Sequence, residues 1–241
     1  EGGTTNRSTQ PSFVVPRLRG LYWQKGVLSS QRAICHNAVM AVVTTTKFGF
    51  VCYGCGATSA ADTRTYTCAQ CGEPMAIQSY AHPDTAELRR AHGSMWSYFD
   101  LLPIHSRDDV ISLNEGATPL LDAPKLAASN QVARVLLKNE TGNPTGSFKD
   151  RQVSVGISHA RALGFDTVAV VSSGNVACAT AAYAARAGMK AVLFMHGMAA
   201  PGKIAQAAAY GATVIKVQSP SASAVFDLCI EAARYYALAT E

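Results

Sequence analysis

Four cysteines form two matched pairs in a short, glycine-rich stretch of the chain. Cys52 and Cys55 make the first C-x2-C pair, Cys68 and Cys71 make the second, and twelve residues separate the two pairs. Glycines beside the cysteines permit tight turns that direct backbone amides at the sulfur atoms. Four thiolates satisfy the tetrahedral preference of zinc and leave no open position, so the pattern predicts a structural zinc site. A redox-active dithiol is the alternative, but two matched pairs favour a metal.

A lysine that follows a polar turn is the second candidate for chemistry. Residues 139–151 read Asn-Glu-Thr-Gly-Asn-Pro-Thr-Gly-Ser-Phe-Lys-Asp-Arg, and Ser147 is a favourable N-cap for a helix that begins near Lys149. The helix dipole disfavours an ammonium group at this end, and the neutral amine is the form that attacks an aldehyde. The spacing therefore fits a lysine that forms a Schiff base. It fits an ordinary surface lysine on a first helical turn equally well.

The third candidate is the loop Ser172-Ser173-Gly174-Asn175, which lies between a strand-like run and an alanine-rich helical run. Such a turn directs several backbone N–H groups and a helix dipole at one point, which suits an anion such as a carboxylate. The carboxamide of Asn175 can donate to a phenolate oxygen. An ordinary capped turn between a strand and a helix would have the same features.

Alternating strands and helices must position these residues. We expect a helical pattern over 82–106, followed by strands at 134–138, 167–171, 191–195 and 213–217 and helices at 147–163, 177–187, 203–210 and 221–238. Runs such as Val-Ala-Val-Val are apolar on both faces, which is typical of a parallel sheet covered on each side. The predicted fold class is α/β, a parallel sheet wound with helices on both faces and preceded by a small zinc ribbon.

Composition and charge exclude other classes of protein. Apolar residues make up 48% of the chain and charged residues 15%, which is typical of a globular protein, and no eighteen apolar residues run together to predict a membrane span. The net charge of +5 comes entirely from residues 1–50, which hold six basic residues and one acid. The neutral remainder argues against a nucleic-acid partner. The odd count of seven cysteines and the lack of a signal-peptide core favour the cytoplasm.

In chain order, these motifs resemble those of the threonine synthases. The stretches that carry the resemblance are Glu115-Gly-Ala-Thr-Pro-Leu120, Asn143-Pro-Thr-Gly-Ser-Phe-Lys-Asp-Arg151, Ser172-Ser-Gly-Asn175 and Gly202-Lys-Ile-Ala-Gln206. Threonine synthases belong to the tryptophan synthase β-like class of pyridoxal-phosphate enzymes, and the ribbon is similar to that of their prokaryotic members. The resemblance covers about residues 48–241, and it implies the same fold class, truncated at its C-terminal end.

The resemblance also implies roles for individual residues. Lys149 matches the catalytic lysine that holds pyridoxal 5'-phosphate and then moves protons at the substrate carbons. Phe148 matches the residue that packs against the cofactor ring, and Asn175 matches the one that hydrogen-bonds the cofactor's phenolic oxygen. The substrate α-carboxylate would lie against Ser172, Ser173 and Gly174. The implied reaction converts O-phosphohomoserine and water to threonine and phosphate, in an enzyme that is a homodimer when full length.

We expect three regions along the chain. Residues 1–47 are predicted to form a poorly defined extension, with the natural start at Met40 and a transit peptide as the alternative. Residues 48–80 are predicted to form the zinc ribbon, and residues 81–241 the N-terminal part of the catalytic domain. The phosphate-binding glycine loop and the hydroxyl group at the pyridine nitrogen occur later in the family, so we expect this piece alone to bind cofactor weakly.

One departure from the family keeps other functions open. Val176 stands where many threonine synthases have a threonine whose hydroxyl lies near the substrate phosphate. A threonine or serine dehydratase, or a cysteate synthase-like enzyme that replaces a group at the β-carbon, is therefore the second hypothesis. A non-catalytic zinc-ribbon binding protein with a relic α/β domain is the third, and the intact Lys149 and Asn175 argue against it.

Overall fold

The fold is that of a computed structural model, which describes residues 47–60, 67–79, 93–219, 221–236 and 239–240. Most of the predicted N-terminal extension, with Met40, lies outside the described residues, as does the predicted boundary between residues 80 and 81. Residues Thr44–Glu241 form one compact unit. Within its described part, no helix combines the length and apolar character needed to cross a membrane.

A small antiparallel sheet carries the cysteine pairs. Its strands are β1 (Phe48–Cys52), β2 (Thr58–Ser59) and β3 (Met75–Ser79), in the order β2-β1-β3. Side chains alternate across a strand, so Phe48 and Phe50 share one face of β1, and both are buried. The Phe48 ring stacks on His105 with a centroid distance of 4.5 Å and meets His159 edge-on at 6.3 Å. Aromatic packing therefore attaches this sheet to the rest of the unit.

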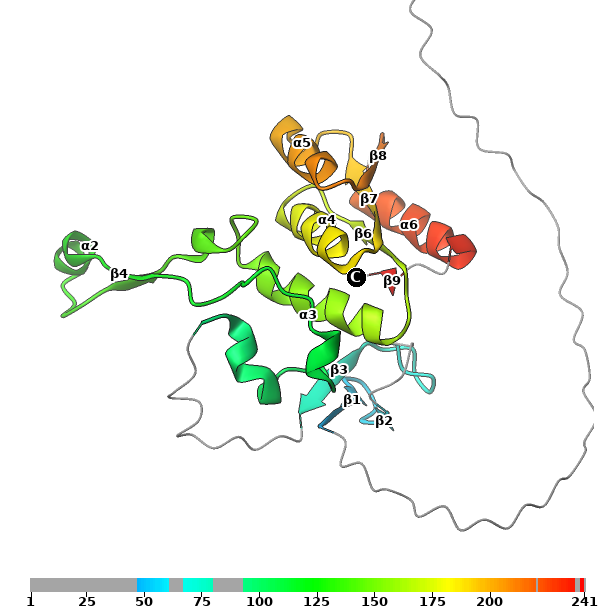
Figure 1. The fold of residues 1–241 in the computed structure, drawn as a ribbon, viewed down its shortest axis with the longest axis horizontal. Helices are drawn as coiled ribbons and strands as arrows, with labels where there is room; N and C mark the ends of the chain where they lie inside the picture. Colours follow the sequence, from blue (N-terminus) through cyan, green and yellow to red (C-terminus); the bar gives the residue numbers. More distant parts are fainter. Residues whose placement is uncertain (1–46, 61–66, 80–92, 220, 237–238, 241) are drawn as a thin grey trace, which may run out of the picture. The chain divides into compact units, whose positions relative to one another are not determined.

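A four-stranded parallel sheet forms the centre of the remaining fold (Figure 1). Its strands are β6 (Thr167–Val171), β7 (Lys190–His196), β8 (Thr213–Val217) and β9 (Ala239–Thr240), in the order β8-β7-β6-β9. All three pairings are parallel. The three longer strands are the predicted ones.

Helices cover both faces of this sheet, with α4 and α5 on one side of β6–β8 and α6 on the other (Figure 1). The helices are α3 (Lys149–Ala162), α4 (Asn175–Ala187), α5 (Pro201–Ala209) and α6 (Ala222–Tyr236), each within two residues of its predicted bounds. Val168 and Val170 pack in the core with α3 and α4, whereas Ala169 packs with Val225 of α6. Apolar side chains alternate between the two faces of β6, so both faces must be buried under helices. This arrangement confirms the predicted fold class.

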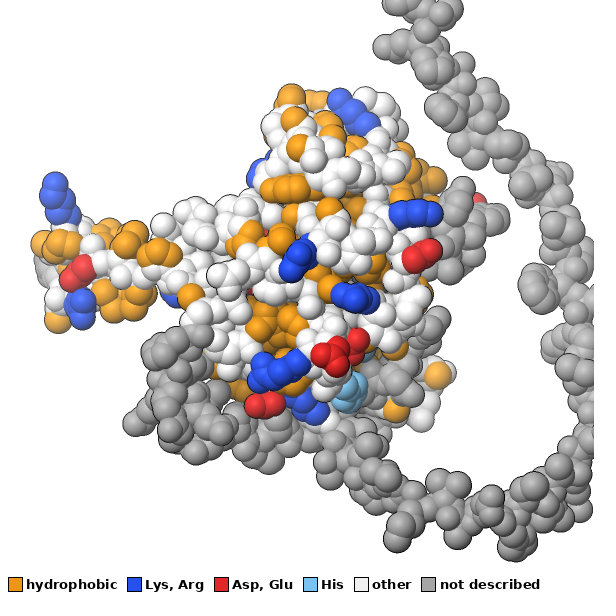
Figure 2. Space-filling view, viewed as in Figure 1, with side chains coloured by type: hydrophobic (Ala, Val, Ile, Leu, Met, Phe, Trp, Pro, Cys, Tyr) orange, Lys and Arg blue, Asp and Glu red, His pale blue; other side chains and the backbone are white. Residues whose placement is uncertain are grey.

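The segment predicted as a strand at 134–138 does not belong to the parallel sheet. It forms β5 (Leu136–Lys138), which pairs antiparallel with β4 (Leu120–Asp122), and the short helix α2 (Pro124–Ser129) connects the two. We call β4, α2 and β5 together the arm. Hydrophobic side chains gather on it (Figure 2), and its exposed large hydrophobic residues are Leu120, Leu121, Leu126, Val132, Leu136 and Leu137. The expectation that this strand opens the βαβ series was wrong, because β5 is paired and packed apart from β6–β9.

The helical pattern predicted over 82–106 is only partly described. Residues 80–92 lie outside the described chain, and the following stretch forms the 3₁₀ helices η1 (Met95–Leu101) and η2 (Arg107–Asp109). Met95, Trp96 and Phe99 are buried, as their spacing predicts. The helix type differs because the run is short and Leu102 N–H bonds to Phe99 O, three residues back.

A buried carboxylate connects η1, α3 and α4. The Glu115 side chain is fully buried, and it accepts hydrogen bonds from Trp96 Nε1 at 2.6 Å, Tyr183 Oη at 2.8 Å, Leu113 N at 2.9 Å, Ser112 Oγ at 3.1 Å and Ser154 Oγ. Burial and the neighbouring Glu115 raise the pKa of Tyr183, so the phenol stays protonated and donates. Gly116 has φ +97°, and a Cβ there would come within 2.5 Å of Met95 N, so only glycine permits this turn.

We expect Glu115→Ala to lower the free energy of unfolding by about 3 kcal/mol or more, because it leaves several buried donors without an acceptor. Tyr183→Phe removes one donor and should cost about 1 kcal/mol. Urea unfolding followed by tryptophan fluorescence measures both. Asp122→Ala is the control, since Asp122 pairs with Arg134 at 3.4 Å on the surface and should cost less than about 1 kcal/mol. Equal unfolding midpoints for Glu115→Ala and Asp122→Ala would contradict the assigned role.

Candidate functional site

Lys149 is the first residue of α3, two residues after the predicted start of the helix at residue 147. Phe148 stands at the N-cap position, and the predicted cap residue Ser147 accepts the Lys149 backbone N–H at 3.3 Å. The Lys149 ammonium donates to Gln152 Oε1 at 3.1 Å and lies 5.1 Å from the centroid of the Phe148 ring. The Phe148 side chain is 56% exposed. An amine and an aromatic face are therefore presented together at one helix end.

The residue after Lys149 fixes the turn that leads into the helix. Asp150 is fully buried, and its carboxylate accepts the Thr145 backbone N–H at 2.7 Å and the Thr145 hydroxyl. Burial raises the pKa of Asp150, while the two Thr145 bonds oppose that rise. Asp150 thus holds the backbone four residues before Lys149, a role that the sequence analysis missed. Its place inside the Ser-Phe-Lys-Asp-Arg motif was the available signal.

Arg151 holds the same turn through Glu140, a residue earlier in the chain. Its guanidinium forms a two-pronged pair with Glu140, Nε to Oε2 at 2.8 Å and Nη2 to Oε1 at 2.9 Å. The Thr118 hydroxyl donates to Glu140 at 2.7 Å, and the Asn143 amide donates to it at 2.9 Å. Hydrogen bonds lower the pKa of Glu140 to about 2, and those from Arg151 have the largest effect. The carboxylate is therefore ionised near neutral pH and holds the turn against α3.

The predicted anion-binding loop lies at the carboxyl end of β6, directly before α4. Ser173 Oγ accepts the His196 backbone N–H at 2.9 Å, and Ser172 Oγ accepts the Gly174 N–H at 3.3 Å. A hydroxyl has one hydrogen to donate besides its two lone pairs, so each serine that accepts from an amide keeps its O–H for another acceptor. A Cβ placed on Gly174 would meet no atom within 4 Å, so the loop borders open space.

The two groups that flank this loop differ in exposure. Asn175 is the first residue of α4 and is exposed, so its carboxamide is accessible. Val176 packs partly buried against the main core cluster, which contains neighbouring alanines of α4. The side chain at position 176 therefore contributes to packing in this chain.

Helix α5 links the lysine turn to the start of α4. Gln206 of α5 donates to Thr145 O at 3.3 Å, and Cys178 in the first turns of α4 contacts Lys203 O of α5 at 3.5 Å. The turn before Lys149 and the first turns of α4 therefore both lie against α5. Among the described residues, no hydrogen bond joins Lys149 directly to Asn175 or to Ser172–Gly174.

The donor set at these helix ends fits part of the cofactor that the resemblance implies. Pyridoxal phosphate needs an amine for its aldehyde, a donor for its phenolic oxygen and an apolar surface for its ring. Lys149, Asn175 and Phe148 supply these groups from exposed or half-buried positions. The open space at Gly174 leaves room for an anion at the loop.

The four cysteines converge at the ends of the small antiparallel sheet. Their Sγ atoms all lie within 4.8 Å of one another, with Cys52 and Cys71 3.4 Å apart and Cys55 and Cys68 3.6 Å apart. Tetrahedral Zn–S bonds of about 2.3 Å place the sulfurs about 3.8 Å apart, so the cluster matches the size of a zinc site. The hydrogen bond from the Cys55 amide has the largest effect in lowering the pKa of the Cys52 thiol to about 6. The pKa of the Cys71 thiol is raised instead, because hydrogen bonds within the cluster outweigh the bond from the Glu73 amide that lowers it.

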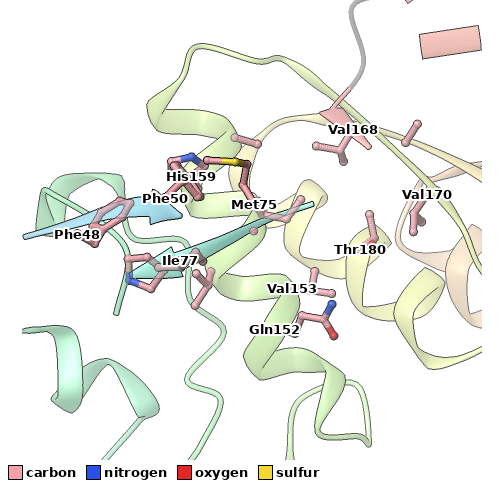
Figure 3. A pocket seen from close by; sticks show the side chains of 16 residues that line it. Phe48, Phe50, Met75, Ile77, Gln152, Val153, His159, Val168, Val170 and Thr180 are labelled. Atoms are coloured by element: carbon pink, nitrogen blue, oxygen red, sulfur yellow. The ribbon is translucent and has the colours of Figure 1, made fainter. Parts of the chain in front are cut away.

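A cavity of about 400 Å³ lies between β1, β3 and α3 (Figure 3). Its walls are mainly apolar, with Phe50, Met75 and Val153 among the lining residues. None of the predicted site residues lines it, and its one link to them is Gln152, which accepts from Lys149. The cavity is therefore distinct from the helix ends that carry the polar groups.

Known proteins that resemble this chain include several threonine synthases. That of Methanocaldococcus jannaschii is 38% identical over 174 residues, which cover 69% of this chain and 42% of that protein. That of Mycobacterium leprae is 42% identical over 143 residues, which cover 59% of this chain and 38% of that protein. The chain thus spans about two fifths of the length of these curated relatives.

The fold also has a counterpart among solved structures. Holo diaminopropionate ammonia lyase from Escherichia coli superposes with a TM-score of 0.50 at 19% identity, over 54% of this chain and 38% of that chain. A family model described as pyridoxal-phosphate dependent enzyme matches residues 111–241, more than half of the chain. The chain therefore belongs to the family of pyridoxal-phosphate dependent enzymes.

Proposed function

We propose that this chain is part of a threonine synthase, which converts O-phosphohomoserine and water to threonine and phosphate with pyridoxal phosphate as cofactor. The observation that carries the proposal is the position of Lys149 at the start of α3, beside an exposed Phe148 ring. Relatives named threonine synthase, 38–43% identical over 53–69% of the chain, support the choice of reaction. The homodimer, the cytoplasmic location and the absence of a nucleic-acid partner remain predictions.

Each site residue has a definite task in this proposal. Pyridoxal phosphate, when bound, supplies the electron sink that stabilises negative charge on the substrate carbons. The Lys149 amine would hold the cofactor through its aldehyde and would move protons at those carbons. Phe148 would lie against the ring, and the Asn175 carboxamide would donate to the phenolic oxygen.

The loop Ser172–Gly174 would hold the substrate by its α-carboxylate. Both serine hydroxyls accept from backbone amides and keep their O–H groups for a further acceptor, which a carboxylate provides. The N-terminus of α4 adds a favourable dipole for a negative charge. This contact is common to all amino-acid substrates, so a threonine or serine dehydratase is the second candidate. The inward packing of Val176 favours it, since no hydroxyl is offered there to a substrate phosphate.

We propose further that Cys52, Cys55, Cys68 and Cys71 bind one structural zinc ion. The support is the convergence of their Sγ atoms within 4.8 Å. Backbone amides also point at the sulfurs, with Gly54 N 3.3 Å from Cys52 Sγ and Gln70 N 3.4 Å from Cys68 Sγ. Such amides stabilise the negative charge that thiolates keep when they bind a metal. Four protein ligands leave no place for substrate, so the ion would serve the fold.

The lysine assignment is tested in an enzyme in which this chain is joined to a C-terminal half of the length that its relatives have. Borohydride reduction should fix the cofactor on Lys149, as read by peptide mass spectrometry. Lys149→Ala should abolish the label and slow phosphate release from O-phosphohomoserine by roughly a thousandfold. Lys203→Ala is the matched control, because Lys203 also lies in a first helical turn and donates to a glutamine three residues later, at 3.3 Å.

Two outcomes would change the conclusion in different ways. Label on another lysine would remove Lys149 from the site. Label on Lys149 in an enzyme that deaminates threonine and releases no phosphate from O-phosphohomoserine would replace threonine synthase by the dehydratase.

Metal analysis tests the zinc site. The purified chain should contain one zinc ion, and the double variant Cys52→Ser, Cys68→Ser should contain none, because two thiolates cannot complete the coordination. Cys229→Ala is the control, since Cys229 lies on the buried face of α6 and is not one of the four clustered cysteines, so the variant should keep the metal. Zinc retained in the double variant, or absent from the unaltered chain, would exclude the site.

A further inference from the structure

His196 lies at the point where three loops of the parallel sheet meet. It is the last residue of β7, and the loops that follow β6 and β8 flank it on either side. In open α/β sheets, ligands bind outside the carboxyl ends of the strands. His196 contacts all three loops.

Three hydrogen bonds define the environment of His196. Its backbone N–H donates to Ser173 Oγ at 2.9 Å, in the loop after β6. Its ring Nδ1 accepts the Met198 N–H at 3.1 Å, in the loop after β7, and Nε2 lies 2.8 Å from Ser219 O, in the loop after β8. A backbone N–H can only donate and a carbonyl can only accept, so these two contacts fit the tautomer that carries its hydrogen on Nε2.

We propose that His196 is a positioning residue for the substrate carboxylate. The ring fixes the turn after β7 and the loop after β8, and this holds the His196 amide against Ser173 Oγ. The inference rests on the proposed role of Ser172–Gly174 in carboxylate binding. It does not depend on which amino acid is the substrate, because the α-carboxylate is common to all of them.

The chemistry of the Ser173 hydroxyl explains why its position matters. The His196 amide occupies one lone pair of Oγ, so the hydroxyl hydrogen turns away from that amide and toward a further acceptor. A carboxylate at the N-terminus of α4 is such an acceptor. Pairing with Val217 holds the end of β7, and the ring contacts to Met198 and Ser219 add to it at the residue whose amide meets Ser173. Without these ring contacts the amide is held less firmly and the hydroxyl can rotate. One lost hydrogen bond to a charged group weakens binding by roughly tenfold or more.

Three substitutions separate the two ring contacts. His196→Leu removes both, His196→Asn keeps an acceptor near the position of Nδ1, and His196→Gln keeps a donor near the position of Nε2. In the enzyme joined to a C-terminal half, His196→Leu should raise KM for the amino-acid substrate about tenfold and change kcat less than about twofold, because the contact is made equally in the ground state and the transition state. The Asn and Gln variants should each recover part of the loss.

Controls separate positioning from general damage. Lys190→Leu alters an exposed side chain at the opposite end of the same strand and should leave KM unchanged. Borohydride labelling of Lys149 should remain complete in His196→Leu, which shows that the cofactor site is intact. The ¹⁵N chemical shifts of the His196 ring should report the neutral form with hydrogen on Nε2.

The outcomes distinguish this inference from the proposed function. If the enzyme turns over threonine and not O-phosphohomoserine, the same comparison is made with threonine, and the proposed substrate alone has failed. An unchanged KM for His196→Leu in an active enzyme overturns the positioning role, as does a fall in kcat with KM unchanged. An unaltered enzyme that labels Lys149 but binds no amino acid overturns both the carboxylate loop and the role of His196.

Discussion

A fully buried carboxyl group connects elements of the described fold that lie far apart in sequence. The Glu115 side chain accepts hydrogen bonds from an indole, from hydroxyls and from a backbone amide. These donors come from η1, from the adjoining loop and from α3 and α4. A buried polar group that loses its hydrogen-bond partner costs about 1–3 kcal/mol, so this arrangement is stable only while all of these elements are in place. The requirement makes their packing cooperative.

The turn that begins at Glu115 carries this constraint to the lysine. Gly116 N–H donates to Asn143 Oδ1 at 3.0 Å, and the Thr118 hydroxyl binds Glu140, which pairs with Arg151 of α3. The helix is thereby held from inside by Ser154 and at its first turn by Arg151. Lys149 itself makes only one side-chain hydrogen bond among the described residues, to Gln152. The position of its Cα is fixed, whereas its amine remains available for chemistry.

The sequence predicts the parts of this fold whose signals are local. Strands β6 and β7 are apolar on both faces over most of their length and β8 has a short apolar run, so the place of all three in a parallel sheet could be inferred. The arm of β4, α2 and β5 could not, because its leucines are exposed and a short apolar run does not indicate its strand partner. The roles of Asp150 and Glu115 also escaped prediction. Each residue lies within a motif, which is a local signal, but a motif does not identify the hydrogen-bond partners that chain folding brings to a carboxyl group.

The same division supports the proposed binding of a carboxylate at the carboxyl edge of the sheet. The buried polar groups Glu115, Asp150 and Ser154 have their hydrogen bonds satisfied within the protein, so they add rigidity and bind nothing else. At the loop after β6, by contrast, each serine oxygen accepts one amide and keeps one hydrogen. Electrostatic preorganisation requires a hydrogen-bond donor on a rigid backbone, because such a donor is oriented before a charged group binds. In the role proposed for it, His196 belongs to this second group, because its contacts would help to direct the Ser173 hydroxyl toward the substrate carboxylate.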